Sequence, residues 1–140
     1  YKTHFSIWAL LGSPLMIGCD VRKMNRETFG ILSNRELIAI NQDGACRQPF
    51  KLSPVWEGNI KAYAKNLENG DIAVGFFNFG SEKAAARIML DELGLPESTG
   101  RTLKMREVWS GEEITVKNGT FIHELEPYDC LVYRCKVVKK

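Results

Sequence analysis

The sequence predicts the end of an α/β barrel over residues 1–44, followed by an all-β antiparallel sandwich over residues 45–140. The first part shows a helical pattern, a short apolar run, a polar loop and a second helical pattern, which is the repeating order of an α/β barrel. The second part contains about seven short alternating segments separated by turn residues, which is typical of sandwiches and barrels. The pattern changes near Gly44.

The barrel part has clear sequence signals at the boundaries of its elements. We predict a helix over 3–11, a strand over 15–17, a loop over 18–20 and helical segments over 25–33 and 35–41. Ser13-Pro14 ends the first helix, because proline lacks a backbone donor and disfavours helical geometry in the residue before it. Asn25 is a good N-cap for the second helix. Chemistry in such barrels lies where strands end, so the loop over 18–20 is the functional edge.

The sandwich part is predicted from alternation and from turn residues. The expected strands cover 60–66, 72–79, 84–90, 102–108, 113–117, 120–125 and 130–138. Asn69-Gly70 and Asn118-Gly119 carry the Asn-Gly pair that favours tight hairpin turns. Residues 91–96 predict a short helical turn that Gly94 and Pro96 end.

The composition argues against two classes of partner. Of the 140 residues 44% are hydrophobic, which is enough for a core. The net charge is +2, from 19 basic and 17 acidic residues, and no segment combines basic residues with aromatic ones, so we expect no nucleic acid partner. The longest apolar stretch, 5–21, contains Ser13, Pro14 and Asp20, so we expect no membrane span.

The beginning of the chain and its cysteines bear on its origin. The chain starts at Tyr1 without a signal-peptide pattern, and a helical pattern is already present at residue 3, so we expect a truncated or processed piece. No two of its four cysteines have the Cys-x-x-Cys spacing. Cys130 and Cys135 lie five apart in one predicted strand and face opposite sides, which argues against a disulfide between them. The favoured interpretation is small buried thiols, which leaves the compartment open and favours the cytoplasm over secretion.

Three stretches of the first part resemble glycoside hydrolase family 27, the α-galactosidase (melibiase) group. They are THFSIWAL at 3–10, SPLMIGCDVR at 13–22 and LSNRELIAINQD at 32–43. Weaker similarities occur at 55–56, 73–78 and 108–111. The resemblance implies a (β/α)₈ catalytic barrel followed by an antiparallel β-sandwich, with residues 1–44 as the last barrel strand and its flanking helices.

The resemblance also implies an activity for the complete enzyme. That enzyme would release terminal α-linked galactose through a covalent glycosyl-enzyme intermediate, without a metal or an organic cofactor. Relatives with this pattern act on α-N-acetylgalactosamine or β-L-arabinopyranose as well, so the exact sugar stays open. The expected partners of this chain are an α-galactoside substrate and the N-terminal part of the barrel.

The catalytic aspartates of that family, a nucleophile and an acid/base, come from earlier barrel strands, and their motifs would precede Tyr1. Retaining hydrolysis needs two carboxyl groups about 5–5.5 Å apart. We therefore assign no catalytic residue to this chain and expect the 140 residues alone to be inactive.

Two residues are candidates for substrate binding. Asp20 follows the predicted barrel strand on the face where catalytic loops gather, although a loop-capping role explains it equally well. Ile17 stands at the strand end, where the resemblance implies an apolar wall of the sugar pocket and core packing is the alternative. Cys19 is a further candidate for that wall. His4 and His123 have no third metal ligand near them in the sequence, so we expect no zinc site.

The tryptophans and the first helix leave a second hypothesis open. Trp8 is expected in the core between helix and barrel, and Trp56 and Trp109 in the sandwich or at its contact with the barrel. The alternative function is a non-catalytic β-sandwich that binds carbohydrate or protein. Such a module has no use for the apolar segment 5–17, which in turn predicts self-association of the isolated chain through residues 3–17.

Overall fold

The computed structural model of the chain describes residues 2–16, 18–52 and 59–140. Its helices are α1 (Lys2–Leu11), η1 (Val21–Lys23), α2 (Arg26–Leu32), α3 (Arg35–Asn41), η2 (Leu90–Leu93) and η3 (Glu97–Thr99). Its strands are β1 (Phe50–Leu52), β2 (Ile60–Asn66), β3 (Ile72–Asn78), β4 (Ala84–Met89), β5 (Arg101–Glu107), β6 (Glu113–Thr115), β7 (Thr120–Leu125) and β8 (Cys130–Lys139). The predictions for Ile17, Val55 and Trp56 lie outside the described residues.

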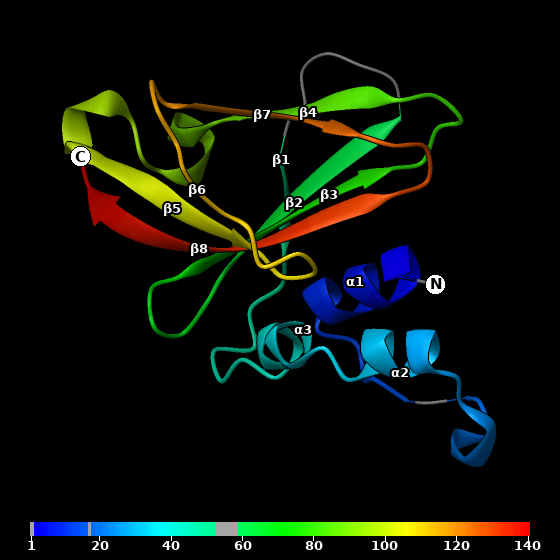
Figure 1. Ribbon diagram of the computed structural model, residues 1–140. Coiled ribbons are helices and arrows are strands. Elements are labelled where there is room, and N and C mark those ends of the chain that lie inside the picture. The colour runs from blue at the N-terminus through cyan, green and yellow to red at the C-terminus, as the bar shows by residue number, and fades with distance from the viewer. Residues whose placement is uncertain (1, 17, 53–58) are drawn as a thin grey trace.

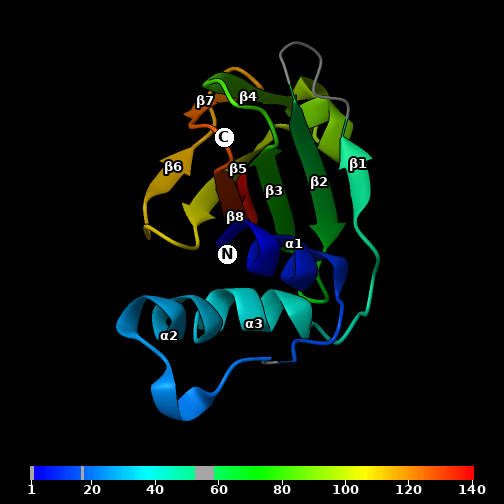
Figure 2. The same ribbon diagram turned by 90° about the vertical axis from the view of Figure 1, so that its right-hand side faces the viewer.

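The strands form two antiparallel sheets, which confirms the predicted sandwich. The larger sheet has the order β1-β2-β3-β8-β5-β6, and the smaller one pairs β4 with β7. Every pairing is antiparallel. Figures 1 and 2 show β4 and β7 above the larger sheet, α1 beneath it, and α2 and α3 in a further layer below α1. The larger sheet is therefore covered on both faces.

Strand β3 lies in the middle of this arrangement, and all seven of its residues are buried. Val74 and Phe76 contribute to the core between the two sheets. Ala73 and Phe77 contribute to a second core, between the larger sheet and the helices. The alternation of side chains along a strand thus places neighbouring residues of one apolar run in two different cores.

The two Asn-Gly turns have different outcomes. Asn69-Gly70 joins β2 to β3, which pair from Asn66↔Ile72 onwards, and Gly70 has a φ of 89°; this predicted hairpin is confirmed. Asn118-Gly119 is also a turn, but β6 pairs with β5 and β7 pairs with β4. The hairpin predicted there is wrong, because Phe121 and Leu125 of β7 are buried in the core between the sheets and require the second layer.

The helices begin and end close to the expected positions. Asn25 Oδ1 accepts a hydrogen bond from the Thr28 N–H at 2.8 Å, which caps α2 as predicted. Asn34 Oδ1 accepts from the Leu37 N–H at 3.0 Å and caps α3 in the same way. These amides satisfy backbone donors that have no partner within the helix.

The strand predicted over 15–17 is not formed by its described residues. Leu15 and Met16 lie in an irregular segment after α1, and Met16 is 89% exposed. A parallel barrel strand needs neighbours along its edges. The strands of the described part all pair within the two sandwich sheets.

The cysteines of β8 confirm the predicted opposite orientation. Cys135 is buried between the two sheets, and Cys130 is buried between the larger sheet and the helices. Both thiols are free. Strand β1, which the sequence did not predict, adds an edge to the larger sheet by pairing with β2.

Helices α1 and α3 are joined to the sandwich by the second core. Ala9 and Leu10 of α1 and Leu37 and Ile40 of α3 are buried in it. The approach of α1 to the sheet is close, since a Cβ on Gly75 would lie 2.9 Å from Leu10 Cδ2. Residues on both sides of Gly44 therefore share one core.

Candidate functional site

The loop at which the barrel chemistry was predicted is held by Asp20 and Arg22. Asp20 is the N-cap of η1, and its Oδ1 accepts from the Arg22 backbone N–H at 3.0 Å. The Arg22 guanidinium donates to both carboxylate oxygens, at 3.0 and 3.1 Å. These side-chain and backbone hydrogen bonds lower the pKa of the Asp20 carboxyl below its ordinary value. Asp20 is thus an ionised carboxylate at neutral pH that stabilises its own loop.

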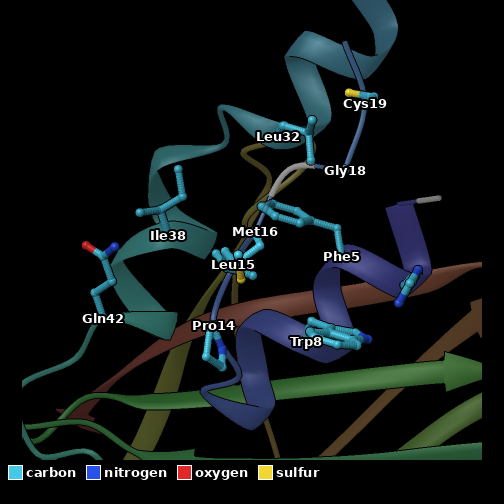
Figure 3. Close-up of a pocket in the computed structure, with 11 residues that line it drawn as sticks. Phe5, Trp8, Pro14, Leu15, Met16, Gly18, Cys19, Leu32, Ile38 and Gln42 are labelled. Atoms are coloured by element: carbon cyan, nitrogen blue, oxygen red, sulfur yellow. The ribbon is translucent and has the colours of Figure 1, made fainter. Parts of the chain in front are cut away.

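A groove with a volume of about 550 Å³ opens beside this loop. It is lined mainly by apolar side chains, among them Phe5 and Trp8 of α1, Leu15 and Met16 of the segment that follows, Leu32 of α2 and Ile38 of α3. Figure 3 shows the segment with Pro14, Leu15 and Met16 running between α1 and the helices that carry Leu32 and Ile38. No carboxylate of the described residues lines the groove. Such walls suit apolar packing better than acid–base chemistry on a sugar.

The predicted site residues are only partly brought together. Gly18 and Cys19 line the groove. Cys19 and Cys46 are both exposed, so the predicted burial of the thiols is wrong for these two cysteines and holds only for Cys130 and Cys135. Asp20 follows them in the chain but is not among the lining residues. Ile17, the other substrate-binding candidate, lies outside the described residues.

The histidines occupy separate environments. The His4 ring meets the Trp8 ring edge-on, with 5.4 Å between the centroids. His123 Nδ1 lies 2.7 Å from the carbonyl oxygen of Glu124. In the described part of the chain, no group of three or more His, Cys, Asp or Glu side chains is arranged to hold a metal ion. The helices of that part also include none long and apolar enough to cross a bilayer.

Trp109 lies at the contact between the sandwich and the helices, one of the two locations expected from the sequence. Its Nε1 donates to Ser6 Oγ of α1 at 3.1 Å, and its ring packs against the second core. The turn that carries it is held by Glu107, which is buried and accepts from the backbone N–H groups of Trp109 and Ser110 at 2.7 and 2.6 Å. Trp8, which was expected in a core, is 44% exposed.

Two further polar residues, Lys65 and Asn41, lie at this contact, and the sequence analysis did not single out Lys65. Lys65 of β2 is 1% exposed, and its ammonium donates to the Ile40 carbonyl oxygen at 3.0 Å. Asn41 Nδ2 donates to the Ser13 carbonyl oxygen at 2.7 Å. Lys65 lies two residues from Tyr63 in β2, so both side chains point to the same face of the sheet, where Tyr63 packs against the second core. This spacing was the one sequence signal that Lys65 faces the helices.

Comparison with known proteins identifies the family. Residues 57–135 match the family model of the α-galactosidase C-terminal β-sandwich domain. Residues 1–43 match a second model, described as α-galactosidase A. The chain belongs to the α-galactosidase (melibiase) family.

Individual α-galactosidases agree with this assignment. Alpha-galactosidase 3 of Arabidopsis thaliana is 39% identical over 135 residues, which cover 95% of this chain and 30% of that protein. The α-galactosidase of Oryza sativa subsp. japonica is 37% identical over 133 residues, covering 95% of this chain and 31% of that protein. The solved structure of α-galactosidase I from Mortierella vinacea has a TM-score of 0.84 at 25% identity, covering 96% of this chain and 34% of that one.

This chain spans about a third of the length of the α-galactosidases it matches. The solved family structures combine a barrel with a sandwich, and this chain corresponds to their C-terminal portion. The fold class expected from the sequence, the end of a barrel followed by a sandwich, is confirmed at that level.

Proposed function

We propose that this chain is the C-terminal part of a retaining α-galactosidase that releases terminal α-linked galactose. Residues 1–44 would close its (β/α)₈ barrel, and residues 45–140 would brace that barrel from one side. Both catalytic carboxylates would lie on barrel strands outside these 140 residues, and the reaction would need no cofactor. The observation that supports this most is the apolar groove of α1, α2 and the segment after α1, which sits directly beside the loop expected to reach the sugar.

An assay of stereochemistry tests this proposal. A longer protein that carries this segment together with a family barrel should hydrolyse an aryl α-galactoside and release α-galactose first, as seen by proton NMR before mutarotation. The 140-residue chain alone should show no turnover, because a retaining mechanism needs two carboxyl groups about 5–5.5 Å apart across the sugar. Turnover that follows the purified 140-residue chain would refute the assignment.

Within that enzyme we propose that Ile17 and Asp20 contribute to substrate binding. Asp20 is already ionised and oriented by Arg22, so a sugar hydroxyl could replace one Arg22 hydrogen bond without a proton transfer. Asp20→Asn should raise KM for the galactoside with a smaller change in kcat. Arg22→Met is the matched control, because it removes the guanidinium and leaves the carboxylate. An unchanged KM in Asp20→Asn would restrict Asp20 to its capping role.

We also propose that the isolated chain self-associates through residues 3–17. Trp8, Leu11 and Met16 are 44%, 41% and 89% exposed, and Trp8 and Met16 both line the groove. Burial of each such side chain contributes about 1.5–3 kcal/mol. Sedimentation should show concentration-dependent association that Trp8→Gln with Met16→Gln removes, and a monomer at all concentrations would contradict it.

A non-catalytic β-sandwich module that binds carbohydrate or protein is the alternative. Residues on both sides of Gly44 share one core, which a free-standing sandwich does not require. Binding of galactose-terminated oligosaccharides by the 140-residue chain, with no hydrolysis by any longer form, would favour this alternative.

A further inference from the structure

The contact between the helices and the sandwich contains a buried charge. Lys65 lies on β2 with 1% of its surface exposed, among apolar neighbours of the second core. A buried ammonium is costly unless polar groups surround it. Burial accordingly lowers the pKa of the Lys65 amine, while the nearby Asp43 and Cys46 act in the opposite direction. The position therefore needs a structural reason for a cation.

That reason is the meeting of two helix C-termini. Ile40, whose carbonyl oxygen accepts from Lys65 Nζ at 3.0 Å, belongs to the last turn of α3. Gly12 directly follows α1, and a Cβ on it would lie 3.8 Å from the same Nζ. Helix C-termini carry partial negative charge, so the ammonium stabilises the end of α3, to which it is hydrogen-bonded, and it lies near the residue that follows α1.

The end of α3 is in turn bound to the segment that leads to the predicted sugar loop. Asn41, the last residue of α3, donates from Nδ2 to the Ser13 carbonyl oxygen at 2.7 Å. Ser13 precedes Leu15 and Met16, which enter the groove on the way to the loop. A continuous series of contacts thus runs from β2 through Lys65, α3 and Asn41 to the segment after α1.

The residues after α3 complete the connection. Asp43 accepts from the Glu68 backbone N–H at 3.0 Å through Oδ2, and from the Ala45 N–H at 3.2 Å. Glu68 lies in the turn between β2 and β3. A second hydrogen bond therefore joins the residues directly after β2 to those directly after α3.

Building on the proposed α-galactosidase function, we propose that Lys65 and Asn41 are positioning residues. Through them the sandwich sets the position of the loop over 18–20, and this position determines the affinity of the enzyme for the sugar. Neither residue touches substrate. An apolar side chain at position 65 would fill the same space, and buried charges are often replaceable by apolar residues without loss of stability. What an apolar residue cannot do is donate the hydrogen bond to the last turn of α3.

The first test uses the 140-residue chain and needs no activity. Lys65→Met keeps an unbranched side chain of similar length and removes the ammonium, and Asn41→Leu keeps the branching at Cγ and removes the donor. Each variant should shift the backbone NMR signals of residues 13–16 and 18–20. The double variant should shift them no further than the larger single variant, because both act on one path.

Arg106→Met is the matched control for this test. It removes another contact between the sandwich and α3, the 2.7 Å ion pair of Arg106 with Glu36, which does not involve Ser13. Its signals over 13–20 should stay unchanged. Additive shifts in the double variant, or unchanged signals over 13–20 in Lys65→Met, would overturn the proposed coupling.

The second test separates the coupling from the assigned activity. In a longer protein with its barrel, Lys65→Met and Asn41→Leu should each raise KM for an aryl α-galactoside about tenfold with a smaller change in kcat, and Arg106→Met should change neither. If Lys65 and Asn41 had only a structural role, the rise in KM of each variant would parallel its loss of thermal stability. If the unmodified protein hydrolyses galactosides and both variants keep its KM, the link to sugar affinity is wrong. If it hydrolyses none, the proposed function fails, and the NMR result alone decides whether the coupling exists.

Discussion

The two faces of the larger sheet are buried in different ways. On one face, β7 directs Phe121 and Leu125 into the core between the sheets. Its alternate residues Ile122 and Glu124 are exposed, so the outer surface of this layer faces solvent. On the other face, α1 covers the sheet and α3 packs below α1, and these helices continue into the apolar groove beside Met16. The sandwich is a complete unit, whereas the helix layer has a second apolar side. This difference indicates that the helices connect the sandwich to something further.

The largest expected effect comes from two neighbouring residues of β3. Phe76 belongs to the core between the sheets and Phe77 to the core under the helices, and both are fully buried. Replacement of either by alanine should lower the free energy of unfolding by about 3–5 kcal/mol. In hydrogen exchange, Phe76→Ala should expose all sandwich strands, and Phe77→Ala should mainly expose α1 and α3. Equal exchange patterns in the two variants would show that the two cores unfold as one.

Gly75→Ala should have the next largest effect, and it acts on the helix side only. The added Cβ would lie 2.9 Å from Leu10 Cδ2, and Leu10 is itself buried. Phe77 Cε2 would lie equally close to the added Cβ, at 2.9 Å. Overpacking of this kind costs about 1–3 kcal/mol. Urea unfolding should show that loss, and the double variant with Leu10→Ala should lose less stability than the sum of the two single variants, because the shortened side chain makes room for the added Cβ. Strict additivity would mean that α1 does not approach the sheet so closely.

Alkaline pH should destabilise the complete sandwich core. Burial raises the pKa of the Cys135 thiol and of the Tyr133 hydroxyl above their ordinary values. Both groups stay protonated in the folded state while their unfolded forms ionise, so the native state binds more protons and stability falls as pH rises. Each group should remove about 1.4 kcal/mol per pH unit above its own ordinary pKa, which is about 8.5 for the thiol and about 10 for the tyrosine hydroxyl.

The measurement is urea unfolding at several pH values from 8 to 11. Cys135→Ala should make the slope of unfolding free energy against pH shallower by about one proton. Lys65 acts in the opposite direction, because its lowered pKa means that the unfolded state binds the extra proton. Lys65→Met is therefore a control that should steepen the decline. If unfolding free energy falls with pH at the same slope in the unmodified chain, Cys135→Ala and Lys65→Met, these two groups do not cause the pH dependence.

The smallest expected effect is that of the exposed ion pair between Arg106 and Glu36. Its nitrogen–oxygen distance is 2.7 Å, but both side chains are partly exposed, at 49% and 33%. Exposed pairs contribute about 0–1 kcal/mol. Arg106→Met should thus change the midpoint of thermal unfolding little, and less still in high salt. A loss comparable to that of Gly75→Ala would mean that charge rather than packing holds the helices on the sheet.

Local sequence signals predicted most of the sandwich. The run 60–66 became β2 at the expected residues, since alternation, a following Asn-Gly turn and the apolar return strand all agree. The N-cap Asn25 was likewise predicted from a local feature. Such elements contain the determinants of their own structure.

The predictions that were wrong depended on distant partners. Asn118-Gly119 has hairpin geometry, but which strands pair is decided by the burial of Phe121 far from the turn. The strand expected over 15–17 requires neighbours that these residues do not supply themselves. The polar contacts of Lys65 and Asn41 join segments 25 and 28 residues apart, and no local pattern specifies them.

We propose that residues 1–44 complete a catalytic barrel that another part of the protein supplies. The most direct test is complementation: the 140-residue chain is produced together with the N-terminal barrel portion of an enzyme that carries it, as two separate polypeptides. The two should copurify and hydrolyse an aryl α-galactoside, whereas neither should do so alone, and Phe77→Ala in the 140-residue chain should weaken the recovered activity. Full activity of the barrel portion without this chain would contradict the claim.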